Sequence, residues 1–248
     1  MAQEITKLFA KRSERYPEPD EADVAHATAR ALLSTLPVIG GPAAELFSQV
    51  ITPALSRRRD EWLKDLADAV DRLEAARGNF KVENLVSDER FLSAVIQTTR
   101  SAIATHEPDK REMLRNALLN SVASPSSIEG IEDLFFALID SFSVSHIKVL
   151  EFIWKGVATL NEAGKWNPMD PYRYHDYRSA IGEVYPELKG QDGLISCLMA
   201  DLRSKGLSTV VGPDDVFPKS SGITNMGIQF LNFILEPPKA LLGPESSK

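Results

Sequence analysis

The most apolar stretch of the chain, from Leu32 to Ile51, limits its fold more than any other feature. A transmembrane helix needs about 20 continuous apolar residues, but Pro37 and the sequence Gly40-Gly41-Pro42 interrupt this stretch. Proline is tolerated in the first turn of a helix and disfavoured inside one. The stretch therefore predicts two packed helices, one over residues 21–36 and one that begins near Pro42. The sequence leaves one alternative open, a hairpin that leaves the protein core and enters a membrane.

The composition is that of an ordinary globular protein, with 43% hydrophobic and 25% charged residues in a chain of 248. The net charge of −7 disfavours nucleic acid or an anionic membrane as a partner of the whole surface. The single cysteine, Cys197, excludes an internal disulfide and a cysteine-based zinc site. Its apolar neighbours predict a buried, inert thiol. Because the first residues contain no signal-like apolar segment, we expect a cytoplasmic protein.

Apolar residues recur at helical spacing over residues 1–163, which predicts a bundle of six or seven helices. Pro53 is expected to kink or end the helix that begins at Pro42, and Gly78 to end the next one. Later helices are expected to begin at Ser87-Asp88-Glu89 and at Ser143 or Ser145. The predicted inward-facing residues are Leu46, Phe47, Val50, Ile51, Leu55, Trp62, Leu63, Leu66, Val70, Leu73, Phe91, Leu92, Val95, Ile96, Ile103, Met113, Leu114, Leu118, Val122, Leu134, Phe135, Leu138, Ile139, Phe142, Ile147, Val149, Leu150 and Ile153.

The pattern changes after residues 164–171, which contain two prolines and a glycine and are the best candidate for a linker. Helices are predicted over residues 174–184 and 191–205. The second is expected to end at Gly206 and to face inward with Leu194, Ile195, Leu198, Met199 and Leu202. A β-hairpin over residues 207–223 and a closing helix capped by Thr224 are predicted to follow. This order is typical of a winged helix. We therefore predict a mainly α protein, in which a helical bundle (1–163) precedes a small winged-helix-like α+β unit (171–236) and a flexible tail (237–248).

No sequence pattern for catalysis or cofactor binding occurs in the chain. There is no phosphate-binding GxxxxGK[ST] loop, no GxGxxG after a strand, no GxSxG and no HExxH. The four histidines are far apart and are expected to be surface or half-buried helix residues: His26, His106, His146 and His175. We expect a protein that is not an enzyme and has no catalytic residues, metal site or cofactor.

Aromatic residues gather around the predicted linker. Four of the five tyrosines fall within fourteen residues, next to a tryptophan. Tyrosine and tryptophan are favoured at the centres of binding interfaces, so the cluster is a candidate interaction patch; the alternative is that the linker and the first helix of the C-terminal unit pack through it against the bundle. Its members are Trp166, Tyr172, Tyr174, Tyr177 and Tyr185.

The charges of the predicted winged helix disfavour DNA binding. A recognition helix normally carries basic and amide side chains, but the helix over residues 191–205 has no net charge. Residues 171–236 contain six basic and eight acidic residues, and Asp214 and Asp215 of the predicted wing would face phosphates. A protein partner or self-association is therefore favoured over nucleic acid.

Two stretches carry a resemblance to a known family: LRNALLNSVAS together with IEDLFFALIDSFSVSHIKVLEFI, and a TxxGxxFLxFI ending after Gly206-Leu207 and the hairpin. Over roughly residues 85–234 the chain resembles the Abi-alpha family of bacterial abortive-infection proteins. The resemblance implies a helical bundle and a bacterial protein linked to phage defence, and it transfers no catalytic residue.

The leading hypothesis from the sequence is a non-enzymatic cytoplasmic protein that acts through protein contacts, in bacterial phage defence. Two other functions stay open. One is a membrane-perturbing effector that uses the hairpin over residues 32–51. The other is a winged-helix regulator that binds DNA.

Overall fold

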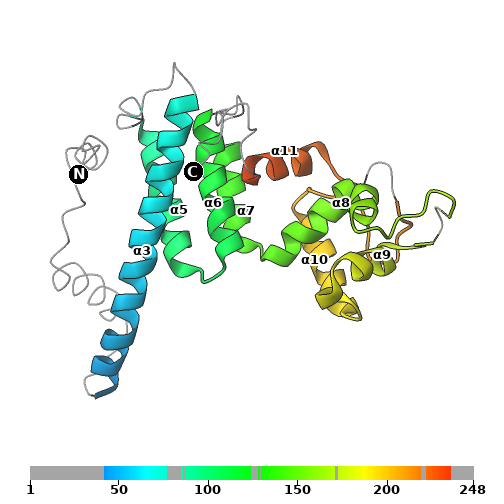
Figure 1. Ribbon diagram of the computed structural model, residues 1–248, viewed down its shortest axis with the longest axis horizontal. Helices are drawn as coiled ribbons and strands as arrows, with labels where there is room; N and C mark the ends of the chain where they lie inside the picture. Colours follow the sequence, from blue (N-terminus) through cyan, green and yellow to red (C-terminus); the bar gives the residue numbers. More distant parts are fainter. Residues whose placement is uncertain are drawn as a thin grey trace. The chain divides into compact units, whose positions relative to one another are not determined.

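A computed structural model describes residues 42–76, 85, 88–123, 128, 130–170, 173–218 and 222–235; for residues 42–53 and Ala76 it defines the backbone alone. The described part is mainly helical, as predicted (Figure 1). The predicted helix over residues 21–36, the side chains of Leu46, Phe47, Val50 and Ile51, and the tail over residues 237–248 lie outside this description.

The chain separates into two compact units between Glu129 and Gly130. The described residues before this point form the N-terminal unit, and those from Gly130 to Leu235 form the C-terminal unit. The predicted linker over residues 164–171 therefore lies within the C-terminal unit. The predicted domain boundaries stay a prediction, because compactness alone does not establish which segments fold independently.

Three helices make up the described part of the N-terminal unit: α3 (Pro42–Ala76), α5 (Glu89–Ala104) and α6 (Pro108–Ala123). Each packs against the other two (Figure 1). Helix α3 begins at Pro42 as predicted, but the expected break at Pro53 is wrong, because α3 continues through it. An interior proline costs roughly 3 kcal/mol, which the buried helical residues beyond it offset. That buried face consists of Trp62, Leu66, Ala69, Val70 and Leu73.

The predicted inward face of α5 was partly wrong. The helix begins within the predicted stretch Ser87-Asp88-Glu89, where Asp88 is the cap and accepts the backbone N–H groups of Arg90 and Phe91. Its buried residues are Phe91, Ala94, Thr98 and Ala102, whereas Ile96 is 48% exposed. The small residues Ala94, Thr98 and Ala102, spaced by four, allow neighbouring helices to approach closely, which leaves Ile96 at the edge of the contact.

The C-terminal unit contains α7 (Ile131–Ser141), α8 (Val144–Glu162), α9 (Tyr177–Val184), the short 3-10 helix η1 (Pro186–Leu188), α10 (Asp192–Ser204) and α11 (Asn225–Ile234). Helix α8 packs against α9, α10 and α11. Phenylalanine rings join α7 to α11: the Phe135 ring centroid is 5.5 Å from that of Phe230 and 5.4 Å from that of Phe233. Phe136 is buried in this cluster, whereas Leu134, which was predicted to face inward, is 44% exposed.

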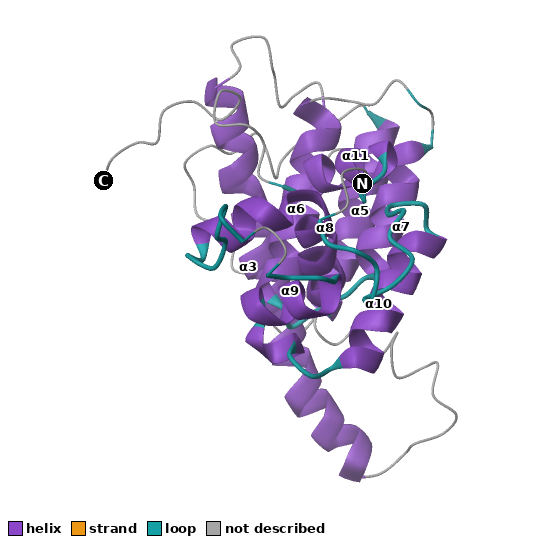
Figure 2. Ribbon diagram, turned by 90° about the vertical axis from the view of Figure 1, so that its right-hand side faces the viewer, coloured by secondary structure: helices purple, strands orange, loops and turns teal. Residues whose placement is uncertain are grey.

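The predicted β-hairpin is not formed in the described residues. Figure 2 shows helices and loops there but no strand. The described residues of the segment 207–223 form only isolated antiparallel bridges, Ser208 with Ile223 and Val216 with Asp176 of the preceding segment. Pro213 and Pro218 have no N–H group to donate to a ladder. The Asp215 carboxylate accepts the N–H groups of Val211 and Val216, so these donors are not available to a strand pair.

Two local signals at helix ends in the C-terminal unit were predicted correctly. Gly206 follows α10 with a φ of 74°, a left-handed conformation that glycine adopts without strain. The Thr224 hydroxyl caps α11 by accepting the Gly227 N–H group at 2.9 Å. These two residues fix the ends of the segment that replaces the hairpin.

Candidate functional site

The predicted aromatic patch does not form one exposed surface in the described residues. Tyr174 and Tyr177 are only 4% and 1% exposed. The Tyr177 ring packs edge-on against Phe152 and Phe217. Trp166 and Tyr185 are half-buried, and Tyr172 lies outside the described residues. Tyr174 and Tyr177 therefore pack inside the C-terminal unit, and an interaction role for the cluster stays a prediction.

Tyr185 lies in a charged environment between α8 and η1. The Lys148 Nζ is 2.8 Å from the Glu187 Oε1 and lies 5.7 Å from the centroid of the Tyr185 ring. Burial, together with the nearby Glu151 and Glu187 carboxylates, raises the pKa of Tyr185 to about 12. Burial likewise raises the pKa of Glu151, although the Lys155 ammonium opposes this shift.

The raised pKa of Tyr185 predicts a loss of stability in alkali. The unfolded chain ionises this tyrosine at a pKa of about 10, whereas the folded chain retains the proton up to about pH 12. The stabilisation is therefore complete below pH 10 and is lost as the pH rises toward 12. In urea unfolding at pH 9.0 and at pH 10.5, Tyr185→Phe should lose less stability between the two pH values than the wild type. An equal loss in both proteins would contradict the raised pKa.

The loop at residues 211–216, which we call the wing loop, exposes two valines. Val211 is 62% and Val216 is 71% exposed, whereas their neighbours Val210 and Phe217 are 0% and 5% exposed. Both valine N–H groups bind the carboxylate of Asp215, at 3.2 Å and 3.1 Å. One carboxylate thus holds the two valines close to each other, with their side chains on the outside.

An arginine of α9 ties the wing loop to the start of α10. The Arg178 guanidinium contacts Asp192 at the first residue of α10 and binds the Asp214 carboxylate at 2.6 Å. The backbone N–H group of Arg178 donates to the Pro213 carbonyl at 2.9 Å. The hydrogen bond to Asp214 is the main cause that raises the pKa of Arg178. The positive charge of Arg178 is therefore neutralised by two carboxylates.

The outward face of α10 differs from the prediction at two positions. Ile195, Leu198, Met199 and Leu202 are buried as predicted, but Leu194 is 46% exposed. Cys197 is exposed, so the predicted burial of its thiol is wrong. The four buried residues repeat at spacings of three and four. This repeat places position 197 on the opposite face of the helix and position 194 at the flank of the buried stripe.

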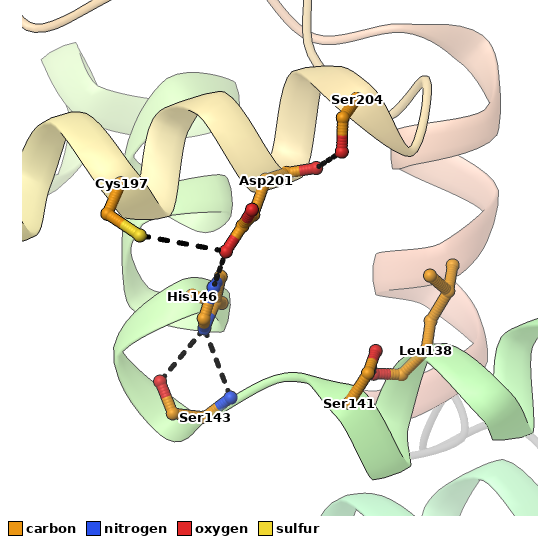
Figure 3. A network of polar contacts seen from close by, with 7 residues as sticks. All are labelled: Leu138, Ser141, Ser143, His146, Cys197, Asp201 and Ser204. Carbon is orange, nitrogen blue, oxygen red and sulfur yellow. Dashed lines mark hydrogen bonds and ion pairs between the residues drawn. The ribbon is translucent and has the colours of Figure 1, made fainter.

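A polar network joins the start of α8 to α10 (Figure 3). The His146 Nδ1 accepts the Ser143 N–H group at 3.1 Å and lies 2.9 Å from the Ser143 Oγ. Its Nε2 lies 3.3 Å from the Asp201 Oδ2. Because the backbone N–H group donates to Nδ1, the proton of a neutral His146 lies on Nε2 and points at Asp201.

The network also contains the chain's one cysteine, but it lacks the arrangement of a nucleophile and its base. The Cys197 Sγ is 3.9 Å from the Asp201 Oδ2 (Figure 3). Cys197 and His146 therefore both contact Asp201, and no hydrogen bond joins the two in the described structure. A base that activates a thiol must reach it directly, whereas the contacts of His146 with Ser143 are those of a helix cap. Sequence reasoning missed the network because 55 residues separate His146 from Asp201.

Two kinds of feature are absent from the described residues, a metal-binding cluster and a membrane-spanning helix. No group of three or more His, Cys, Asp or Glu side chains is arranged there to hold a metal ion. None of the helices described is long and apolar enough to cross a membrane.

Comparison with protein-family models finds no match, and comparisons with curated proteins and with solved structures find no significant match. The fold and the site geometry are therefore the available basis for a function.

Proposed function

We propose that the protein is non-enzymatic and acts through protein contacts, and that residues 171–236 form a reduced winged helix. In this proposal α9 and α10 are the two helices of the motif. The wing of the motif is the segment over residues 207–223, which includes the wing loop. Its strand pairs are reduced to isolated bridges in the described residues.

The observation that carries the proposal is the chemistry of the wing loop. A DNA-binding wing presents cations to phosphates, but here Arg178 is held by Asp192 and Asp214. The Asp214 side chain is itself 79% exposed. Val211 and Val216 are exposed beside these acids, and exposed apolar side chains rimmed by polar groups are typical of protein interaction sites.

The link to phage defence depends on the resemblance to the Abi-alpha family alone. That resemblance is carried by residues of α6, α7, α8 and α11, and it brings no catalytic residue. The comparison with family models adds no support for it.

A plaque assay with matched variants tests both parts of the proposal. Bacteria that express the wild-type chain should yield fewer plaques than bacteria with an empty vector. Val216→Asp should abolish this protection, because it places a charge at the centre of the proposed contact. Met169→Asp is the control, since Met169 is 91% exposed and lies outside the wing loop. Surface substitutions usually change stability by about 0.5 kcal/mol or less, so both variants should melt like the wild type.

Each outcome of this assay bears on one part of the proposal. Equal plaque numbers with and without the wild-type chain would contradict the role in defence. Protection that survives Val216→Asp would contradict the wing loop as the contact. Binding to double-stranded DNA that weakens at higher salt and is lost in an Arg203→Gln, Lys205→Gln double variant would favour the DNA-binding regulator instead.

A further inference from the structure

The C-terminal unit contains a cavity of about 520 Å³. It lies beside α9, close to the first residue of α10. Residues before α9, residues of α9 itself and the turn between η1 and α10 line it. A volume of this size lies within the range of small-molecule sites, about 300–1,000 Å³. All of the lining residues belong to one compact unit.

Basic residues gather around this cavity although the chain as a whole is acidic. Arg173, Arg178 and Lys189 line it, against two acidic residues, Glu183 and Asp192. A further cation lies next to the cavity lining, because the Lys165 Nζ is 3.5 Å from the Glu183 Oε2. This local excess of positive charge contrasts with the net charge of −7 of the chain.

The acidic residues of the cavity compensate part of this charge. Asp192 and Asp214 of the wing loop both pair with Arg178, and Glu183 is shared by two lysines, with its Oε1 3.4 Å from the Lys189 Nζ. The Lys189 and Lys165 ammonium groups lower the pKa of Glu183, so this carboxylate stays ionised at neutral pH. One carboxylate neutralises only one of its two lysines.

Arg173 supplies a second uncompensated charge. Its guanidinium lies 5.7 Å from the centroid of the Tyr174 ring, and no carboxylate pairs with it among the residues described. Tyr174 is buried, so its ring is held in place and gives the exposed guanidinium a fixed surface to pack on. An arginine held in this way presents a planar set of N–H donors that suits carboxylate and phosphate groups.

The backbone beside these cations leaves room for a ligand. Gly190 has a φ of 77°, and no atom lies within 4 Å of where a Cβ would stand at Gly190 or at Gly193. The Gln191 side chain at the start of α10 makes no capping hydrogen bond. The N–H groups of the first turn of α10 therefore add donors to a site that the cavity and its cations already define.

We propose that this cavity binds a small molecule with one phosphate or carboxylate group, held by Arg173 and Lys189. The anion pairs with the Arg173 guanidinium, which no carboxylate contacts among the residues described, and with the ammonium of Lys189, which shares its carboxylate with Lys165. Such a site would give the protein a small-molecule effector. It does not depend on the protein contacts proposed above.

An NMR titration of the full-length chain with inorganic phosphate and, separately, with acetate tests this proposal at constant ionic strength. We expect saturable shifts at the amides of Gly190, Gly193 and Ser179. Arg173→Gln and Lys189→Gln should each weaken binding about tenfold, the effect of losing one charge-assisted hydrogen bond. Lys205→Gln is the control, since this exposed lysine lies at the far end of α10 and should leave binding unchanged.

The two titrations also identify the ligand group. Saturation by phosphate but not by acetate would indicate a phosphate ligand, and the reverse a carboxylate ligand. Shifts that rise linearly without saturation for both anions would overturn the proposal. So would equal binding by the wild type and by two cavity variants whose spectra show that they are folded.

Discussion

Gly227→Ala should strongly destabilise the C-terminal unit. Gly227 is the third residue of α11, and a Cβ built there would lie 2.3 Å from the Leu207 carbonyl oxygen and 2.8 Å from the Ile223 Cγ1. The carbonyl belongs to the backbone and accepts the Thr224 N–H group at 3.1 Å, so it cannot move without loss of a hydrogen bond. Overpacking of this kind costs about 1–3 kcal/mol, and we expect the upper end.

Helix propensity opposes this loss but does not cancel it. Alanine is favoured over glycine inside a helix by about 1 kcal/mol, so the net loss should be about 2 kcal/mol, a large part of the roughly 5–15 kcal/mol of a stable domain. Urea unfolding followed by circular dichroism measures it. Hydrogen exchange at the amides of α8 and α10 would locate the loss in the C-terminal unit.

A second glycine in the first turn of a helix provides the control. At Gly193 of α10 no atom lies within 4 Å of the point that an alanine Cβ would occupy, so Gly193→Ala should leave stability unchanged or slightly raise it. If both substitutions had the same effect, the close contact between α11 and the Leu207 carbonyl would be contradicted.

Helix positions could be predicted from the sequence because their signals are local. The caps at Asp88 and Thr224 and the stop at Gly206 each depend on a few neighbouring residues. Which face of a helix is buried depends instead on its partners. Ile96 and Leu194 are apolar but exposed, because small residues in α5 and an apolar stripe in α10 make the contacts.

The prediction of a β-hairpin was wrong for a similar reason, because a strand also depends on its partner. The run Leu207–Val211 has β-prone residues, but strand formation needs a partner with free donors. The Asp215 side chain takes two of those donors, and no propensity argument includes that bond. The candidate site was likewise only partly visible. The tyrosine cluster marked residues 172–185 as a candidate site. The sequence pattern did not predict that Tyr177 is buried in the core. It also did not predict that the neighbouring Arg178 joins α10 to the wing loop.

Trp62→Ala should produce a comparable or larger loss in the N-terminal unit. Trp62 of α3 is 2% exposed, and its Nε1 donates to the Thr99 Oγ1 of α5 at 3.0 Å. Truncation of a buried tryptophan costs about 3–5 kcal/mol, and the Thr99 hydroxyl also loses its donor. Trp62→Phe should cost less, because the ring still fills most of the space.

The matched control is the same truncation at a half-buried tryptophan. Trp154 of α8 lies beneath the Lys155 ammonium, which is 3.9 Å from the ring centroid, and it is only partly covered. Urea unfolding followed by circular dichroism, which does not depend on the tryptophans as a probe, should order the losses as Trp62→Ala, then Trp62→Phe and Trp154→Ala. A loss for Trp62→Ala no larger than that for Trp154→Ala would mean that α3 does not bury this ring against α5. The packing of Trp62 against α5 in the core of the N-terminal unit would then be contradicted.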